Sequence, residues 1–382
     1  MIKVCVVVAS RANYGRVKYL LKALQDSSFI ELQILVGASL MLDRFGKAVN
    51  IMRNDGFEPD KAIYYSVEGE TLLTQAKSTG LGVIELATAF TELNPDFVVT
   101  VADRFETMAT AISATYLNIP LIHLQGGEVS GNIDDRVRHA ITKLADFHFV
   151  ATEESRERVI KMGERAESVF NYGCPAMDVI ANSDLTINND VMSNYGGVGV
   201  GVDWDEPYIL MIQHPVTTSY GEGFVQVNET LQALLEFKDH QKIVLWPNSD
   251  AGGEDVAKGI RVFRENHMTD NFHFYKNFSA EDFIRVLKNA DCSVGNSSSF
   301  LREGSFLGCP AVSVGDRQND REHSDNVVFS AYDRNDLEDM ISRQISHGPY
   351  GRSDLFGNGD AGKRICEEIR NLKPHLLKSM TY

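Results

Sequence analysis

The sequence predicts an α/β protein with two Rossmann-like halves, each built on a parallel β-sheet that helices cover on both faces. Three observations support this fold class. Apolar runs of four to eight residues alternate with amphipathic segments in both halves of the chain, which is the pattern of strands and helices in parallel sheets. Segment 182–207 interrupts this alternation with polar residues and glycine. The length of 382 residues exceeds what one hydrophobic core usually holds.

In the first half, the segment 3–9 (KVCVVVA) is short, apolar and β-branched, so it is predicted as a first strand and not as a signal peptide. Each later strand is a short apolar run, and each helix is a longer amphipathic segment. The predicted strands are 3–9, 31–36, 97–101, 120–125, 147–151 and 169–172. The predicted helices are 14–24, 45–54, 70–93, 104–117, 135–145 and 153–162.

The second half repeats the alternation after the Gly-rich break. Its predicted strands are 208–213, 242–247, 272–275, 292–294 and 311–314, and its predicted helices are 224–237, 254–267, 280–289, 301–307 and 361–371. The domain prediction is therefore a first domain at 1–181, a linker at 182–207 and a second domain at 208–360. The C-terminal segment 361–382 is expected to pack back on the first domain.

Composition limits the possible partners. The chain carries 37 Lys and Arg against 53 Asp and Glu, a formal net charge of −16, and it has no basic stripe, so a nucleic-acid partner is not expected. No apolar run reaches the roughly 18 residues of a membrane helix, so no membrane partner is expected. Five scattered cysteines without paired spacing are typical of reduced thiols in a cytoplasmic protein, and not of a disulfide framework or a zinc site.

Acidic and basic residues gather where two neighbouring strands of the first half end. FVVTV is followed by ADRFE, and IPLIHL by QGGEVSGNIDDRVRH. Because open α/β sheets bind ligands at the carboxyl ends of their strands, we expect Asp103, Glu128 and Asp134 to lie near one another, with Arg104 beside them. Carboxylates in different environments serve as general acid and base. Asp134 or Asp135 could simply cap the next helix, but a cap does not explain Asp103 or Glu128.

Groups suited to a diphosphate also follow predicted strands. SRANYG places Arg11 after the first strand, where its guanidinium could bind a phosphate or could simply be solvated. SVGNSSSFLREGS places Ser297 and Ser298 before a predicted helix, with Glu303 one turn inside it. Free N–H groups at a helix N-terminus favour anions, although an N-cap serine run is the simpler explanation. GDRQ adds Arg317 after the next strand.

Two more strand ends of the second half carry polar side chains. QHPVTT places His214 directly after strand 208–213, where it would face a cleft between the domains. A single histidine is more often structural, but the strand-end position favours a role in the site. WPNSDAGG offers Asn248, Ser249 and Asp250 at another strand end; the alternative is a polar turn without a function.

Taken together, these motifs resemble those of the hydrolysing UDP-N-acetylglucosamine 2-epimerases of sialic-acid-type sugar biosynthesis. The resemblance spans essentially the whole chain and rests, in order, on SRANYG, ADRFE, HLQGGEVSGNIDDRVRHAITKLAD, QHPVTT, PNSDAG, GNSSSFLRE and GDRQ. It implies a GT-B-like fold with UDP in the interdomain cleft. It also implies conversion of UDP-N-acetylglucosamine and water into N-acetylmannosamine and UDP. In the family, anti elimination of UDP across C1–C2 gives a glycal, and water then adds with inversion at C2.

Carried onto this sequence, the resemblance assigns UDP contacts to Arg11, Arg104, Asn248, Ser297, Ser298, Glu303 and Arg317. It assigns catalytic positions to Asp103, Asp134 and His214. The family's Gly-Asp-Arg begins with Ala102 here, and some relatives have a catalytic Glu where this chain has Gln125. Gln cannot act as a base but can hydrogen-bond a sugar hydroxyl or acetamido group. Either Glu128 or another carboxylate replaces that Glu, or the substrate differs.

Several alternatives stay open at this point. Similar enzymes use UDP-2,4-diacetamido-2,4,6-trideoxyglucose on the route to legionaminic acid. A GT-B glycosyltransferase would share the diphosphate site, although the carboxylates between 103 and 135 disfavour it. A non-catalytic UDP-sugar sensor would be favoured only by Gln125. The resemblance implies a homodimer or homotetramer, and neither a cofactor nor a metal is expected.

Overall fold

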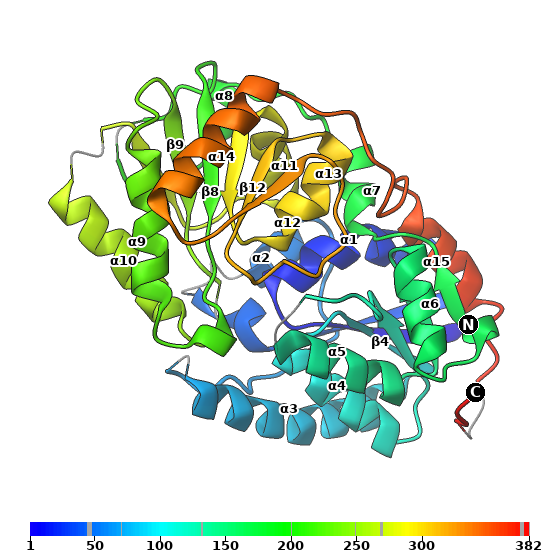
Figure 1. Cartoon of the computed structure of the whole chain (residues 1–382). Coiled ribbons are helices and arrows are strands. Elements are labelled where there is room, and N and C mark those ends of the chain that lie inside the picture. Colours follow the sequence, from blue (N-terminus) through cyan, green and yellow to red (C-terminus); the bar gives the residue numbers. More distant parts are fainter. Residues whose placement is uncertain are drawn as a thin grey trace. The chain divides into compact units, whose positions relative to one another are not determined.

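The computed structural model describes residues 1–43, 48–69, 71–130, 133–199, 201–248, 250–267, 270–374 and 378–381. The chain divides into two compact units (Figure 1). Unit 1 comprises Met1–Val129, Ile133–Asn182 and Phe356–Tyr382, and unit 2 comprises Ser130–Asn132 and Ser183–Leu355. Among the described helices, none is long and apolar enough to cross a membrane.

Unit 1 is built on a parallel sheet. Its described strands are β1 (Ile2–Val8), β2 (Ile30–Val36), β3 (Lys61–Ala62), β4 (Phe97–Val101), β5 (Leu121–Leu124), β6 (Phe147–Val150) and β7 (Val169–Asn171). They are ordered β3-β2-β1-β4-β5-β6-β7. The chain therefore builds outward from β1 in one direction and then continues from β4 in the other. Such a reversal of strand order is where doubly wound sheets bind ligands.

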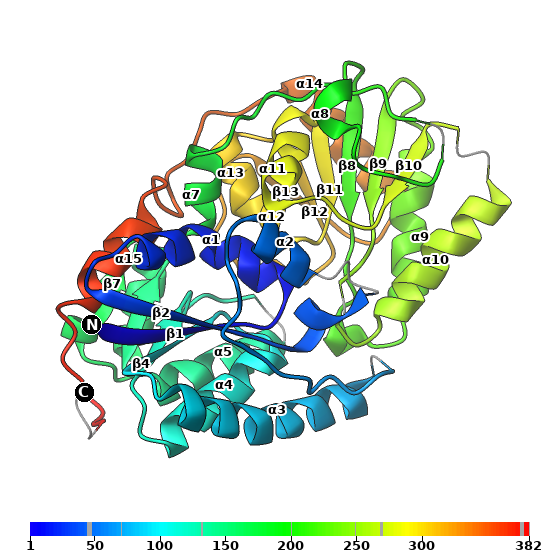
Figure 2. The same cartoon turned by 180° about the vertical axis from the view of Figure 1, so that it is seen from behind.

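Helices cover both faces of the unit 1 sheet because successive side chains of a strand point to opposite faces. Val4, Val6 and Val8 of β1 pack in one core, while Cys5 and Val7 pack in the other. The first core includes α1 (Arg11–Gln25), α2 (Ala48–Asn54) and α15 (Ala361–Ile369). The second includes α3 (Leu72–Leu93), α4 (Phe105–Tyr116) and α5 (Ile133–Leu144). In Figure 2, α1 and α15 lie along one side of this sheet, and α3, α4 and α5 along the other.

The chain returns to unit 1 near its C-terminus, where a buried carboxylate holds the start of α15. Asp178 lies in α7 (Ala176–Ala181) and accepts hydrogen bonds from the N–H groups of Ala361 (3.0 Å) and Gly362 (2.7 Å). Burial raises the pKa of Asp178 to about 6 despite these two donors. Ile365 and Ile369 of α15 then pack in the core that contains α1.

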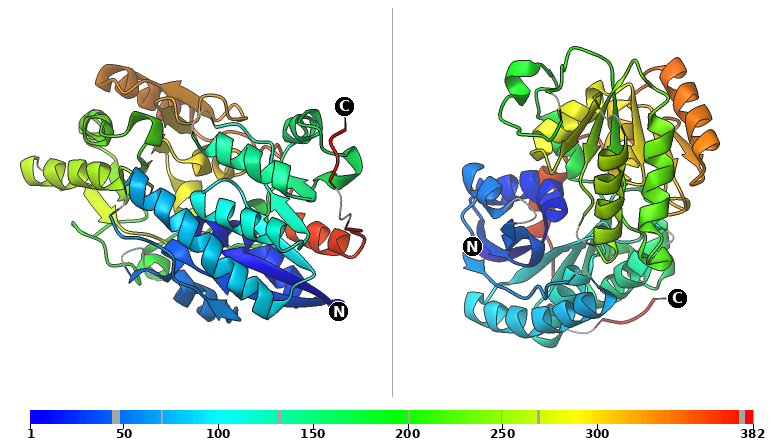
Figure 3. Two further views of the ribbon diagram at one scale, coloured as in Figure 1. Left: turned by 90° about the horizontal axis from the view of Figure 1, so that it is seen from below. Right: turned by 90° about the vertical axis from the view of Figure 1, so that its left-hand side faces the viewer.

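Unit 2 repeats the architecture. Its described strands are β8 (Tyr208–Ile212), β9 (Gln241–Leu245), β10 (Phe272–Tyr275), β11 (Cys292–Gly295), β12 (Ala311–Val314) and β13 (Val327–Ser330), ordered β10-β9-β8-β11-β12-β13 and all parallel. One face carries α9 (Gly223–Leu234), α10 (Gly253–Asn266) and α14 (Arg334–His347). The opposite face carries α11 (Ala280–Asn289), α12 (Ser298–Leu301) and α13 (Glu303–Leu307); the views in Figures 2 and 3 agree on this layering.

Several element boundaries differ from those predicted. Helix α1 begins at Arg11 and not at residue 14, because Ser10 caps it by accepting the Asn13 N–H (3.2 Å). The helix predicted at 301–307 is two short helices, α12 and α13, that meet at Arg302. The starts predicted at 45 and 70 lie outside the described residues.

Other segments were assigned differently or missed. The predicted linker contains α8 (Asn189–Met192) and an antiparallel bridge between Val198 and Phe274, and residues 183–207 belong to unit 2. Strand β13 and helix α14 lie where the sequence analysis placed no element. Residues 356–360 belong to unit 1, although the predicted second domain included them.

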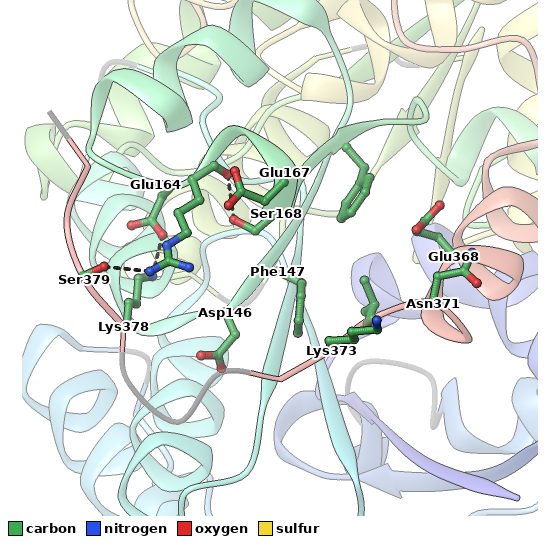
Figure 4. A pocket seen from close by; sticks show the side chains of 13 residues that line it. Asp146, Phe147, Glu164, Glu167, Ser168, Glu368, Asn371, Lys373, Lys378 and Ser379 are labelled. Atoms are coloured by element: carbon green, nitrogen blue, oxygen red, sulfur yellow. Dashed lines mark hydrogen bonds and ion pairs between the residues drawn. The ribbon is translucent and has the colours of Figure 1, made fainter.

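Unit 1 also contains a cavity of about 260 Å³ beside the amino ends of β6 and β7 (Figure 4). The buried carboxylate of Glu164 lies at its wall and contacts Lys143, Lys378 (2.8 Å) and His148 (3.2 Å). Burial alone would raise the pKa of Glu164. The hydrogen bonds from His148, Lys143 and Lys378 outweigh burial and lower the pKa to about 2.

Replacing Glu164 by Gln is therefore expected to lower the free energy of unfolding at pH 7 and to have little effect near pH 2. A carboxylate whose pKa is lowered on folding stabilises the protein above its unfolded pKa of about 4.3. That stability is lost as the pH falls through the folded value. Urea unfolding of both proteins between pH 7 and pH 2 measures the difference. Glu167→Gln, an exposed neighbour in the same cavity wall, is the matched control. A pH-independent difference for Glu164→Gln would contradict the expectation.

Candidate active site

The site residues predicted in unit 1 lie at the carboxyl ends of its central strands. Arg11 follows β1, Asp103 follows β4 and Gln125 follows β5. Strands β1 and β4 are neighbours at the point where the strand order reverses. The structure thus places these three residues at the edge where a ligand of this sheet type is expected.

The turn that carries Asp103 has an unusual backbone. Ala102, the residue before it, has φ 63°, a left-handed conformation that glycine adopts without strain and other residues rarely adopt. The family pattern has a glycine at this position, and a glycine would adopt the same turn without strain. The Ala102 N–H donates to the Leu124 carbonyl (2.9 Å), so the turn is fixed against the end of β5.

Arg138 is the hub of the unit 1 cluster. Its side chain, on α5, is 1% exposed. One guanidinium nitrogen, Nη2, contacts the carboxylate of Asp103. The other, Nη1, donates to Asp135 Oδ1 (2.5 Å) and to the Glu128 carbonyl oxygen (2.7 Å). One buried cation thus binds two carboxylates and the backbone carbonyl of a third acidic residue through charge-assisted hydrogen bonds.

Asp134 and Glu128 flank this hub in sequence. Asp134 lies in the first turn of α5 and is partly exposed, a position in which the helix dipole stabilises a carboxylate. Glu128 is 5% exposed and follows two glycines. A Cβ on Gly127 would lie 2.4 Å from the Ser155 carbonyl oxygen, and Gly127 has φ 76°, so only glycine suits this turn.

Arg104 and Gln125 have partners within unit 1. Arg104 occupies the N-cap position of α4, and its Nε and Nη2 pair with the fully buried carboxylate of Glu106 (3.1 and 3.2 Å). Gln125 is 1% exposed and has φ 62°. Its side-chain oxygen accepts from Arg16 (3.0 Å), and its amide donates to the sulfur of Cys174 (2.9 Å). Both ends of the Gln125 amide therefore bind protein groups.

In unit 2, the predicted residues gather around Asn296, which is fully buried directly after β11. Its side chain accepts the N–H of His214 (2.7 Å) and donates to the His214 carbonyl (2.9 Å). Its own carbonyl accepts from Arg317 (3.0 Å) and from Gln318 (3.0 Å). The Asn248 N–H donates to His214 Nδ1 (3.2 Å), so the neutral imidazole carries its proton on Nε2.

Asn248 and Arg317 also meet at Asp250. The Asn248 amide donates to Asp250 Oδ2 (2.6 Å), and Arg317 Nη2 lies 3.7 Å from the same oxygen. Three strand ends, those of β8, β9 and β12, are thereby tied to the end of β11. Ser249 lies outside the described residues.

The serine run after β11 forms a tight turn. Gly295 has φ 133°, and a Cβ there would lie 2.0 Å from the Ile212 carbonyl oxygen, so the chain leaves β11 in a conformation reserved for glycine. Ser297 caps α12 by accepting the Ser299 N–H (3.4 Å), and Ser298 is the first helical residue. Glu303 begins α13 and does not lie one turn inside a single helix, which corrects the sequence prediction.

Sequence reasoning missed the two hubs, Arg138 and Asn296. Arg138 stands in the motif QGGEVSGNIDDRVRH and Asn296 in SVGNSSSFLREGS, but neither was assigned a role in the site. The available signal was their position within motifs already singled out: Asn296 directly follows β11, and Arg138 lies in α5, the helix that follows the QGGE segment after β5. Their side chains bind residues 35 and 82 positions away, and no local pattern reveals such pairings.

Comparisons with known proteins agree with this architecture. The family model described as UDP-N-acetylglucosamine 2-epimerase matches residues 22–370. The chain is 33% identical to a Legionella pneumophila protein named UDP-N,N'-diacetylbacillosamine 2-epimerase (hydrolyzing), over 98% of this chain and 97% of that protein. It is 28% identical to a UDP-N-acetylglucosamine 2-epimerase of Neisseria meningitidis, over 97% and 96% of the two chains.

Solved structures share the fold. The crystal structure of Methanocaldococcus jannaschii UDP-GlcNAc 2-epimerase in complex with UDP-GlcNAc and UDP matches with a TM-score of 0.81 at 16% identity, over 97% of this chain and 100% of that one. The predicted fold class, GT-B-like with two Rossmann-like α/β domains, is confirmed. The chain belongs to the UDP-N-acetylglucosamine 2-epimerase family and is an enzyme of that family.

Proposed function

We propose that this enzyme hydrolyses a UDP-2-acetamido sugar with inversion at C2, converting UDP-N-acetylglucosamine and water into N-acetylmannosamine and UDP. The observation that carries the proposal is the Arg138-centred carboxylate cluster, which includes Asp103 at the carboxyl end of β4 in the unit 1 sheet. A protein that only bound UDP-sugars would not need this cluster. Two relatives, from Legionella pneumophila and Campylobacter jejuni, carry names with the term hydrolyzing.

The proposed reaction has two stages. In the first, a base removes the proton from C2 while the C1–O bond to UDP breaks on the opposite face, which leaves a C1–C2 double bond. In the second, a water oxygen bonds to C1, and a proton is delivered to C2 from the other face. Asp103, Asp134 and Glu128 are the carboxylates proposed for these transfers, with His214 as a further proton-transfer group. Gln125 would hydrogen-bond and not transfer protons.

Leaving-group stabilisation must supply much of the rate, because a C2 hydrogen with no adjacent carbonyl is hardly acidic. We assign this role to the polar edge of unit 2, where Arg317, Asn248, Ser297, Ser298 and Glu303 would hold UDP, with Arg11 and Arg104 from unit 1. Cationic forks and oriented N–H groups stabilise charge that develops on a departing diphosphate. Protein partners already hold these side chains, as Asn296 holds Arg317, so the side chains need little reorganisation during the reaction.

The test uses the purified enzyme with UDP-N-acetylglucosamine in water enriched in both ¹⁸O and deuterium. The expected product is N-acetylmannosamine with ¹⁸O at C1 and deuterium at C2, together with unlabelled UDP. Interconversion of UDP-sugars without UDP release would show a non-hydrolysing 2-epimerase. UDP release that requires an added acceptor would show a glycosyltransferase.

A second substrate is supported by a specific observation. The relative that is 33% identical is named for UDP-N,N'-diacetylbacillosamine, and position 125 is Gln in this chain. We propose UDP-2,4-diacetamido-2,4,6-trideoxyglucose as the alternative substrate, processed by the same two stages. Rates measured side by side on the two UDP-sugars decide between them.

Replacing Arg317 by Ala is expected to weaken UDP binding by roughly 10- to 100-fold, the usual value of a charge-assisted hydrogen bond to phosphate. The side chain is 12% exposed, so it can donate to a ligand while Asn296 holds it. Isothermal titration with UDP measures the change. Arg264→Ala, on α10 away from these strand ends, is the control. Unchanged UDP affinity in Arg317→Ala would remove this residue from the site.

We also propose that the chain forms a homodimer through α3. Leu73, Leu81 and Ile84 are 64%, 43% and 64% exposed on one face of this helix. Lys77 and Glu85 are exposed and lie four residues on either side of Leu81, so an antiparallel second copy centred on Leu81 would pair each Lys77 with a Glu85. Sedimentation should show a dimer that Lys77→Glu weakens and the Lys77→Glu/Glu85→Lys double variant restores. The two side chains lie about 12 Å apart along the helix, too far for such a rescue within one chain.

A further inference from the structure

His123 is a buried histidine that no step of the proposed reaction uses. It lies in β5 and is 0% exposed. Its Nε2 is 2.8 Å from the carbonyl oxygen of Ala102, and its Nδ1 is 3.3 Å from the hydroxyl of Thr142. A carbonyl oxygen can only accept, so the proton is on Nε2, and Nδ1 accepts from the Thr142 hydroxyl. Burial lowers the pKa of His123 to about 3, so the ring is neutral near pH 7.

The two partners of His123 belong to the two segments that hold the Asp103–Arg138 ion pair. Ala102 directly precedes Asp103 and has φ 63°. A non-glycine residue in this conformation costs about 1–2 kcal/mol and persists only where its surroundings determine it. Thr142 lies one helical turn after Arg138 on the same helix, α5. The imidazole therefore bridges the turn that presents the carboxylate and the helix that presents the guanidinium.

Gly126, which lies three residues after His123, leaves room for this bridge. A Cβ on Gly126 would lie 3.0 Å from His123 Nδ1 and 3.0 Å from the Thr142 hydroxyl. Such contacts are tighter than ordinary packing, so a larger residue at 126 would press on the ring and on the hydroxyl at once. Gly126 thus leaves room for the His123–Thr142 contact, while Gly127 allows the turn before Glu128.

We propose that His123 is a positioning residue, which fixes the Ala102–Asp103 turn against α5 so that the Asp103 carboxylate is held on Arg138 where proton transfer requires it. The inference rests on the proposed hydrolysing reaction, because Asp103 is its proton-transfer group. His123 itself touches no substrate. A displacement of about 1 Å at a reacting group can cost about 100-fold in rate, so loss of the bridge should reduce kcat and leave UDP binding, assigned mainly to unit 2, unchanged.

The experiment compares three substitutions of His123. The amide of Gln reaches to about the position of Nε2 and can still donate to the Ala102 carbonyl, whereas the amide of Asn reaches only to about that of Nδ1. Leu has neither group. We expect His123→Leu and His123→Asn to lower kcat by roughly 10- to 100-fold, with KM and the Kd for UDP within about threefold. We expect His123→Gln to recover most of the loss.

His148→Leu is the matched control. His148 pairs in register with His123 on the adjacent strand β6, is also 0% exposed, and contacts Glu164 instead of Ala102. It should lose stability, measured by thermal unfolding, but keep its kcat. If His123→Leu does not fold, the comparison of Gln with Asn at position 123 remains decisive. Equal kcat values in those two variants, or a loss in His148→Leu as large as in His123→Leu, would overturn the proposal.

A spectroscopic measurement separates this inference from the proposed reaction. Long-range ¹H–¹⁵N correlation of ¹⁵N-histidine-labelled protein identifies the His123 signal as the one that is absent in His123→Gln. This signal should be that of a neutral imidazole with its proton on Nε2, unchanged from pH 7 down to about pH 5. A ring protonated on Nδ1 would refute the bridge whatever the enzyme's activity. If the wild type shows this signal but gives no labelled N-acetylmannosamine or diacetamido product, the proposed function fails while the bridge stands.

Discussion

Replacing Asp103 by Asn is expected to lower kcat by about 100-fold or more, the usual range for a general acid or base. Asn has nearly the same shape and can still contact Arg138, but it cannot accept a proton. Because the contact between Arg138 and Asp103 favours the ionised carboxylate, we expect Asp103 to enter the reaction as a proton acceptor. Asp134→Asn is expected to show a loss of the same size.

Steady-state kinetics on the preferred UDP-sugar and calorimetry with UDP test this expectation. The Kd for UDP should change little in Asp103→Asn, so the loss should appear in kcat. Asp135→Asn is the matched control, because Asp135 is the second carboxylate on Arg138 and is not assigned a proton transfer. It should lose less than Asp103→Asn. Wild-type kcat in both Asp103→Asn and Asp134→Asn would show that the proton-transfer groups lie elsewhere.

Replacing Arg138 by Met is expected to lower the free energy of unfolding by about 3–5 kcal/mol, the usual cost of removing one partner of a buried ion pair. The side chain is 1% exposed and binds Asp103, Asp135 and the Glu128 carbonyl. Met fills a similar volume but deprives both carboxylates of their shared cation. Activity should fall as well, because Asp103 loses the group that orients it.

Urea unfolding measures the loss, and a double-mutant cycle with Asp103→Asn assigns it. Because Asn removes the charge that Arg138 balances, the double variant should lose less stability than the sum of the single variants. Arg138→Lys, which keeps the charge but not the fork of donors, should lie between the wild type and Arg138→Met. A loss below about 1 kcal/mol in Arg138→Met would indicate a contact no stronger than an exposed surface pair.

Much of the architecture could be predicted because strand and helix patterns are local. The strands at Phe97–Val101 and Phe272–Tyr275 have the bounds predicted from their apolar runs. The predicted helix boundaries were wrong where a capping residue or a break in the helix sets the actual boundary. Ser10 starts α1 early, and the turn of the chain at Arg302 divides one predicted helix into two. Such caps and breaks depend on single side chains and backbone angles, and the hydrophobic periodicity of the sequence carries no information about these.

The candidate site could be predicted only in part. Asn248, His214 and Arg317 were predicted to follow strands of the second half, and they lie at one edge of the unit 2 sheet. The sequence analysis missed Asn296, which binds His214 and Arg317. For Gln125 the sequence indicated only an ability to hydrogen-bond a sugar, and it did not reveal that the amide binds Arg16 and Cys174. Cys174 lies 49 residues further along the chain, and nothing near Gln125 in the sequence indicates that contact.

The sequence by itself determined the two Rossmann-like halves, the strand ends that carry the functional groups and the family to which the chain belongs, because these follow from local periodicity and from motifs of a few residues. Only the tertiary structure decided which of those groups bind one another. Arg138 of helix α5 contacts Asp103 in the turn after β4, and His123 of the neighbouring strand β5 contacts the carbonyl of the left-handed residue Ala102. Hydrogen bonds between side chains distant in sequence depend on how the sheet and helices pack, and that packing sets the position and charge of the carboxylates.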